Sequence, residues 1–297
     1  MTEEEVLALF ETCSNVGRWG PDDEMGTLNL ITADKRLAAL RSVRVGAVVP
    51  LGARLALGRS AQVPPSAVLA VRQDPRSALD SLTLNVHGYE TTHLDALGHA
   101  FFEGRMWGGR RADAEVRADG LGFGSIDAAA SVGVVTRGVL LDIAGVRGVT
   151  YLAVEDGIGV ADLEAAEARA GVRVEPGDVV FVRSGHALRL ADDGGVHDEL
   201  APHEGVLPEI LPWLHARGAA MYAGDCIERR PTPYLRLPLP FHQVACVAMG
   251  LWLLDCPDLE ALRTACSAHR RSEFAIIIAP LRVPGGTGSA VNPLALF

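Results

Sequence analysis

The sequence lacks the features that define several large classes of protein. It has no apolar run long enough to span a bilayer. Its 27 lysines and arginines are outnumbered by 37 aspartates and glutamates, for a net charge of −10, and no basic run offers a surface for nucleic acid phosphates. The five cysteines are odd in number and widely spaced, and none forms a Cys-x-x-Cys pair. This pattern predicts free thiols in a reducing cytoplasm.

No internal repeat, low-complexity segment or Ser/Gly linker divides the 297 residues. Hydrophobic residues make up 48% of the chain, which is enough for a sizeable core. We therefore expect one domain over residues 1–297, with residues 1–45 as an N-terminal extension packed on it. The first five residues are acidic and lack the basic start of a signal peptide, so we expect a cytoplasmic protein.

The sequence does contain a dense group of polar side chains between residues 87 and 99. This stretch, HGYETTHLDALGH, holds three histidines and two carboxylates. Imidazole and carboxylate are the groups that bind Zn²⁺, Mn²⁺ or Fe²⁺. In an extended segment His93 and Asp95 project to the same face. If a helix begins near Asp95, then Asp95 and His99 share a helix face, and Asp95 could bind one metal ion or bridge two.

The hydrophobic pattern predicts an α/β fold with mixed sheets and flanking helices. We expect buried strands at residues 134–143 and 179–183, helices at 33–40 and 161–170, and a bent strand or strand pair at 45–56. Strands alternate with helices in the second half, whereas the first half is rich in strands. The pattern alone does not separate this architecture from a doubly wound sheet.

Four residues outside the motif are candidates for substrate contact. Trp19, Phe102 and Trp107 could wall an aromatic or apolar pocket, or belong to the core. Asp225 follows a predicted strand; there a carboxylate can be functional or can cap the next turn.

A polar loop region carries three histidines, His186, His197 and His203. They are candidates for substrate contact or for surface positions. Cys226 is the best candidate for a catalytic thiol, because it lies beside Asp225 at a predicted strand end.

Residues 92–99, THLDALGH, resemble the His-x-Gly-Thr-His-x-Asp-Ala-x-x-His signature of the metal-dependent cyclase/hydrolase family. That family includes bacterial kynurenine formamidase and isatin hydrolase. Similar motifs lie around this one in the family's order over nearly the whole chain, at residues 18–30, 176–185, 240–243 and 285–293. The resemblance implies a swivelling β/β/α domain, a divalent metal (zinc or manganese) and assembly as a homodimer or homotetramer.

The resemblance places His93, Asp95, His99 and His242 at family ligand positions. Tyr89 stands where the family has its first histidine, and His87, two residues earlier, could reach the same site.

Leu254 stands where the formamidases have a ligand glutamate, and Asp255 follows it. Because neither Tyr89 nor Leu254 is a good ligand at neutral pH, we expect one tightly bound metal ion per chain.

These observations predict a metal-dependent hydrolase of a non-peptide C–N bond, an amide or cyclic amide, in a small molecule. Metal held by His93, Asp95 and His242 would activate water, and His99 would complete a second metal site or act as general acid and base. One alternative is a metal-dependent cyclase or dehydratase of secondary metabolism. A second is a non-catalytic protein that binds a small molecule on the same fold.

Overall fold

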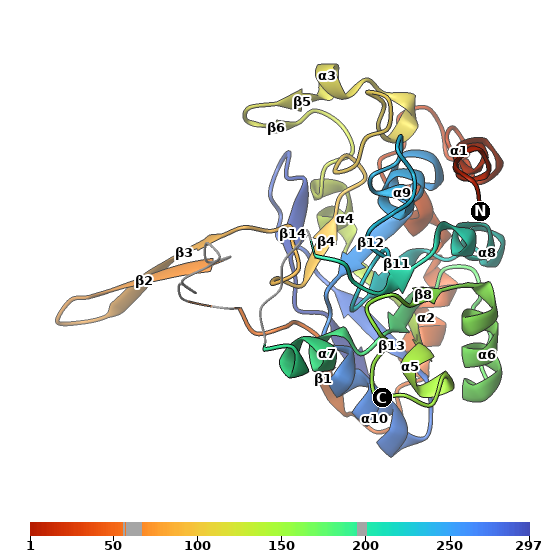
Figure 1. Ribbon diagram of the computed structural model, residues 1–297. Coiled ribbons are helices and arrows are strands. Elements are labelled where there is room, and N and C mark those ends of the chain that lie inside the picture. Colours follow the sequence, from red (N-terminus) through yellow and green to blue (C-terminus); the bar gives the residue numbers. More distant parts are fainter. Residues whose placement is uncertain (56, 58–66, 195–200) are drawn as a thin grey trace.

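The computed structural model describes residues 1–55, 57, 67–194 and 201–297. Its centre is a nine-stranded mixed sheet with the order β1-β15-β13-β7-β9-β11-β12-β4-β14 (Figure 1). The four strands β7, β9, β11 and β12 run parallel, and the pairs outside them are antiparallel. The strands are β1 (Val48–Pro50), β4 (His93–Asp95), β7 (Val134–Asp142), β9 (Val179–Arg183), β11 (Met221–Gly224), β12 (Trp252–Asp255), β13 (Glu273–Ile278), β14 (Gly288–Ala290) and β15 (Leu294–Leu296).

Helices flank this sheet, and both of its faces are buried. Along β9, Val180 and Val182 belong to one hydrophobic cluster, and Val179 and Phe181 belong to the other. The α-helices are α1 (Glu3–Thr12), α2 (Ala33–Arg41), α3 (Ala112–Glu115), α4 (Asp127–Val132), α5 (Ile143–Val146), α6 (Val160–Ala170), α7 (His186–Asp192), α8 (Leu211–Arg217), α9 (Pro240–His242) and α10 (Leu259–His269). The other helical segments are 3₁₀ turns η1 (Gly26–Leu30), η2 (Trp107–Gly109) and η3 (Pro208–Ile210), and a π-helix, η4 (Gln243–Met249).

Among the described residues, three two-stranded sheets lie outside the central one. They are β2 (Ala67–Gln73) with β3 (Ala78–Leu84), β5 (Val116–Arg117) with β6 (Gly120–Leu121), and β8 (Gly157–Ile158) with β10 (Gly205–Val206). The β2–β3 hairpin projects away from the rest of the molecule (Figure 1). Nearly all of its side chains are exposed.

The predicted fold class is confirmed: this is a mixed α/β fold with a large curled sheet and flanking helices. The strands predicted at 134–143 and 179–183 are β7 and β9. The helices predicted at 33–40 and 161–170 are α2 and α6. Within the described residues, none of the helices has the length and apolarity needed to cross a membrane.

The condition of a helix near Asp95 is not met, and the strand predicted at 45–56 forms only in part. No helix begins at Asp95; β4 pairs on both sides, and the chain then turns, with the His99 amide donating to the Ala96 carbonyl at 2.9 Å. Of the strand expected at 45–56, only Val48–Pro50 forms, because the Gly52 amide leaves the ladder and donates to the Asn292 side chain at 3.0 Å. Residue 56 lies outside the described part of the chain.

Candidate metal centre

The side chains of His93 and Asp95 meet those of two distant segments at the end of the central sheet. His93 and Asp95 lie on the same face of β4, with His93 Nε2 3.4 Å from Asp95 Oδ1. Asp255 ends β12 directly opposite His93, and its Oδ2 is 3.9 Å from His93 Nε2. His242, from α9, places Nε2 3.4 Å from Asp255 Oδ2 and 3.8 Å from Asp95 Oδ2. Two imidazoles and two carboxylates therefore converge from three elements.

A hydrogen bond at the Nδ1 atom of each imidazole fixes its tautomer. His93 Nδ1 lies 2.8 Å from the Thr91 carbonyl, which can only accept, so Nδ1 donates. His242 Nδ1 likewise donates to Glu228 Oε1 at 2.8 Å. In the neutral form of each ring, the lone pair on Nε2 is consequently aimed at the carboxylates of the cluster. This arrangement leaves a place for a cation between them.

The donor set suits a divalent metal ion. Two ligands bonded tetrahedrally to one zinc ion lie about 3.4 Å apart, since each bond is about 2.0–2.2 Å long. The separations between Nε2 and carboxylate atoms here are 3.4–3.9 Å. Asp95 Oδ2 and Asp255 Oδ1 are buried and accept no hydrogen bond from the described residues. Buried carboxylate oxygens left in this state are costly unless a cation binds them.

The pKa values of His93 and His242 also indicate that the site favours a positive charge. Burial by itself would lower the pKa of His93, but the hydrogen bond and charge of Asp95 raise it to about 9. Burial also opposes the charged form of His242, yet Glu228 and Asp255 raise its pKa well above the ordinary value. Carboxylates that favour a proton at these nitrogens also favour a metal ion there.

His87 and His99 form a second group around Asp95. His87 Nδ1 donates to Asp95 Oδ1 at 2.9 Å, and the Thr287 hydroxyl lies 2.9 Å from its other nitrogen. The His99 ring stacks on the His87 ring with centroids 4.0 Å apart, and His99 Nε2 is 3.9 Å from Asp95 Oδ2. Because both nitrogens of His87 are hydrogen-bonded, His87 orients Asp95 in this geometry. Together the three could hold a second ion only if His87 gave up one of these bonds.

Burial determines the direction of the pKa shift of His99, whereas neighbouring histidines determine that of Asp95. The pKa of His99 is lowered, chiefly by burial, with the nearby His87 and His242 adding to the effect. Burial would raise the pKa of Asp95, but His99 and the hydrogen bond from His87 hold it well below the ordinary value. A neutral His99 therefore stands beside an ionised Asp95 at neutral pH.

A cavity of about 180 Å³ opens onto the centre. Residues outside the donor groups form the rest of its wall: Gly88, Tyr89, Arg230, Leu239 and Cys256.

The three aromatic candidates, Trp19, Phe102 and Trp107, are not among the residues that line this cavity. Trp107 is 1% exposed, and its indole donates to the Asp23 carbonyl at 2.7 Å. Phe102 stacks on Phe10 at 4.3 Å, and Trp19 packs against the core.

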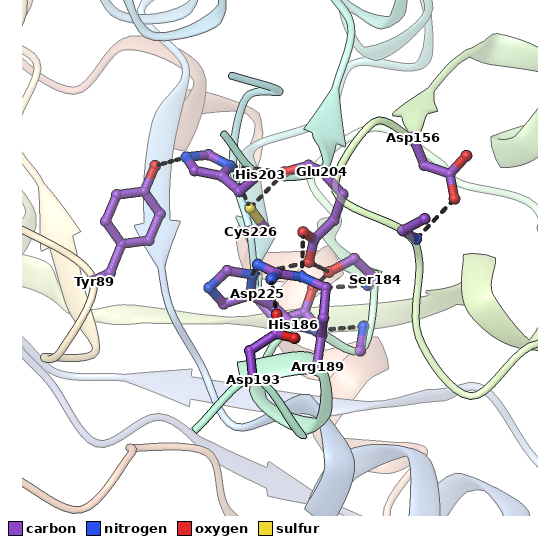
Figure 2. A network of polar contacts seen from close by, with 12 residues as sticks. Tyr89, Asp156, Ser184, His186, Arg189, Asp193, His203, Glu204, Asp225 and Cys226 are labelled. Atoms are coloured by element: carbon purple, nitrogen blue, oxygen red, sulfur yellow. Dashed lines mark hydrogen bonds and ion pairs between the residues drawn. The ribbon is translucent and has the colours of Figure 1, made fainter. Parts of the chain in front are cut away.

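Tyr89 connects this cavity to a buried polar network (Figure 2). Its hydroxyl lies 2.8 Å from His203 Nε2, and His203 Nδ1 donates to the Glu204 carbonyl at 2.8 Å. The Cys226 thiol donates to the same carbonyl at 2.7 Å, and burial raises its pKa well above the ordinary value. A thiol so strongly held in its protonated form is a poor nucleophile. Tyr89, at the position of the family's first histidine, is thus fixed by side chains far away in sequence.

Two further candidates from the sequence, Asp225 and His186, lie at the loop that follows β9 (Figure 2). The Asp225 carboxylate accepts from the backbone amides of Ser184, Gly185 and His186, and from the Ser184 hydroxyl. His186 Nδ1 lies 2.8 Å from Glu204 Oε1, away from the metal centre. His197 lies outside the described residues.

Two residues of the centre were not assigned from the sequence. Asp255 was noted only as the neighbour of Leu254, because the family spacing points to residue 254. The β12 register turns Leu254 into the core and Asp255 toward the cluster. Glu228 has no local signal at all. It lies fourteen residues before His242 and reaches that ring only through the fold.

The sequence profile of the cyclase family matches residues 29–228. This chain belongs to the cyclase family. A crystal structure described as a novel cyclase is similar to it, with 27% identity and a TM-score of 0.84 over 97% of this chain and 99% of that chain. Isatin hydrolase A from Labrenzia aggregata shares 19% identity with a TM-score of 0.60, over 89% of this cyclase-family chain and 98% of the hydrolase.

Isatin hydrolase A from Ralstonia solanacearum is similar at 22% identity and a TM-score of 0.60, over 89% of this chain and 97% of that chain. The isatin hydrolases share the fold with this cyclase-family member. No curated protein matches the sequence. Family membership, together with the donor cluster, indicates an enzyme of the metal-dependent hydrolase or cyclase kind.

Proposed function

We propose that this cyclase-family protein is a metal-dependent hydrolase of a non-peptide C–N bond, in an amide or cyclic amide of a small molecule. The observation that carries the proposal is the convergence of His93, Asp95, His242 and Asp255, with both imidazole lone pairs turned toward two buried carboxylates. The isatin hydrolases with the same fold support the reaction class.

Those four residues would hold the ion, zinc or manganese, since mixed nitrogen and oxygen ligands suit both. When bound, the ion supplies a Lewis acid for a carbonyl and lowers the pKa of water. Glu228 and the Thr91 carbonyl fix the ligand rings through their Nδ1 atoms. The cavity beside the centre accommodates a small substrate, consistent with its volume of about 180 Å³.

His99 is the proposed proton carrier. It lines the cavity, and its lowered pKa leaves Nε2 able to take a proton at neutral pH. In hydrolysis it would accept a proton from the attacking water at Nε2 and deliver it to the departing nitrogen. Asp95, 3.9 Å from that atom, would stabilise the imidazolium formed in between.

The decisive experiment measures metal content and amide hydrolysis together. His93→Ala and Asp95→Ala should each lose retained metal and activity while keeping the circular dichroism of the parent. A panel of formanilides, lactams and isatin, assayed after zinc or manganese loading, would identify the substrate class. Full metal content in Asp95→Ala would contradict the assignment of the centre.

A metal-dependent cyclase or dehydratase is the second candidate. It is favoured by the similarity to the structure described as a novel cyclase, which spans 97% of this chain. Reaction in ¹⁸O-labelled water separates the two: hydrolysis places the label in the product, whereas ring closure with loss of water does not. Activity in neither assay, together with no divalent ion in the purified protein, would favour a non-catalytic binding protein.

We further propose that the chain forms a homo-oligomer through the β2–β3 hairpin. One face of this ribbon carries Leu69 and Val71 on β2 and Leu82 on β3, all exposed. A two-stranded ribbon with an uncovered apolar face is marginally stable in water. Its charges, two arginines and two aspartates, balance between residues 67 and 84, whereas the whole chain carries −10. A second copy of the hairpin could therefore pack on it without repulsion.

A further inference from the structure

A basic cleft lies apart from the cavity of the metal centre, and the two share no lining residue. It is formed between α6, α10 and the end of β7 and has a volume of about 300 Å³. Four arginines and one aspartate line it: Arg169, Arg263, Arg270, Arg271 and Asp142. Because the chain as a whole is strongly acidic, a local excess of guanidinium groups needs an explanation.

The single carboxylate does not neutralise these arginines. Asp142 Oδ1 already accepts from Arg183 at 2.7 Å, and Arg263 Nε approaches Asp142 Oδ2 only to 3.6 Å. Arg169 donates to the Gly145 carbonyl, which carries no net charge. The Arg270 guanidinium forms no ion pair with any residue that the structure describes.

The positive charge of Arg271 is also only weakly neutralised by nearby carboxylates. Its nearest carboxylate oxygen belongs to Glu273 at 3.9 Å, and Glu273 also pairs with Arg137 at 3.0 Å. The remaining polar groups of the cleft, the hydroxyls of Ser267 and Ser272, have no hydrogen-bond partner among residues 1–55, 57, 67–194 and 201–297. The cleft thus presents an array of donors with few acceptors.

Helix dipoles explain part of this array. Arg169 and Arg270 stand at the C-terminal ends of α6 and α10, where a cation is stabilised by the helix. Dipoles do not account for Arg263, in the middle of α10, or for Arg271, which lies beyond it. The convergence of all four on one cavity is the property of an anion-binding site, since guanidinium groups bind phosphate oxygens in pairs.

We propose that this cleft binds a small multivalent oxyanion of the phosphate class, such as a pyrophosphate group. A single carboxylate would leave most of the positive charge uncompensated, whereas a diphosphate carries enough charge and enough oxygens to bridge Arg263, Arg270 and Arg271. The hydroxyls of Ser267 and Ser272 would supply further donors.

The test titrates pyrophosphate into the metal-loaded protein by calorimetry at low ionic strength. We expect one site, weakened by added salt. Arg270→Gln should lower the affinity by roughly tenfold, and Arg263→Gln/Arg270→Gln further, because each loses a charge-assisted hydrogen bond. Arg270 has no ion pair within the described chain to lose, so its replacement should lower the thermal unfolding temperature only slightly, through the lost interaction with the end of α10.

Arg76→Gln/Arg282→Gln is the matched control. It removes the same charge from exposed positions outside the cleft and should bind pyrophosphate as the parent does. Because a metal ion in the catalytic centre can itself bind pyrophosphate, unchanged affinity in Arg263→Gln/Arg270→Gln would locate binding there and overturn the proposal. Absence of binding to the parent, or equal weakening in the control, would also overturn it.

Discussion

Asp255 lies directly opposite His93 in the antiparallel pairing of β12 with β4, and this register brings a carboxylate into the metal centre. A shift of one residue would present Leu254 instead, because neighbouring side chains of a strand point to opposite faces. Leu254 is fully buried in the core and pairs with Leu94. The centre therefore depends on strand pairing as much as on the His-x-Asp motif.

The first prediction concerns Asp255. Asp255→Asn should abolish retention of the metal ion through gel filtration, because a neutral amide replaces one of two carboxylates that face His93 and His242. Elemental analysis gives the measurement, and circular dichroism verifies the fold. Asp22→Asn, at a side chain that is 84% exposed, is the control and should retain the ion. Equal metal content in the two variants would remove Asp255 from the centre.

Glu228 tests the outer support of His242. Its two carboxylate oxygens accept from His242 Nδ1 and from the Phe241 amide, both at 2.8 Å. Glu228→Gln should weaken metal affinity by roughly 10–100-fold, the usual effect of losing such a partner. Competition with a chelator of known affinity measures it. Glu11→Gln, on the surface of α1, should leave the affinity unchanged.

His99 distinguishes one metal ion from two. If His99 carries protons, His99→Ala should lower turnover by roughly 10²–10⁴-fold with nearly unchanged metal content. One ion per chain is expected, because both ring nitrogens of His87 are hydrogen-bonded, one to Asp95 and one to Thr287. Two ions per parent chain, or loss of metal in His99→Ala, would instead make His99 a ligand. Elemental analysis beside steady-state kinetics decides between these outcomes.

The lowered pKa of the Glu204 carboxyl predicts how the stability of the fold depends on pH. Burial would raise its pKa, but His186 and Arg189, each 2.8 Å away, lower it below the ordinary value of 4.5. Stability from this ionised group is therefore complete above that value and is lost as the pH falls through the lowered pKa. Glu204→Gln leaves Arg189 without its buried carboxylate and should cost about 3–5 kcal/mol at pH 7.

Urea unfolding at several pH values checks this. The advantage of the parent over Glu204→Gln should be constant from pH 7 to pH 5 and shrink in more acidic solution. Glu164→Gln, on the exposed side of α6, should follow the parent throughout. An advantage that grows with acidity would contradict the sign of the shift.

The hairpin prediction concerns assembly. Leu69→Glu/Val71→Glu should convert an oligomer into monomers, because four like charges would meet when two hairpins pack. Light scattering after gel filtration measures the mass. Arg72→Glu, at the position after Val71 and on the opposite face of β2, is the control. A parent protein that is monomeric at all concentrations would refute assembly through this face.

The sequence by itself determined the elements whose signals are local. A continuous apolar run made β9 recognisable, because a strand buried on both faces needs no polar alternation. Thr32 and Gly171 marked the start of α2 and the end of α6 by capping, which involves only neighbouring residues. His93 and Asp95 were predicted to share a face, since extended backbone alternates its side chains.

Only the tertiary structure decided what surrounds that pair. The continuation of strand β4 to Asp95 with a turn after it, the inward direction of Asp255 and the contact of Glu228 with His242 all depend on contacts between segments more than ten residues apart. The spacing of residues in the sequence does not determine the register of paired strands, and it does not show which distant loop will contact a site. For the same reason the arginines of the basic cleft, spread from residue 169 to residue 271, form a group only in the folded chain.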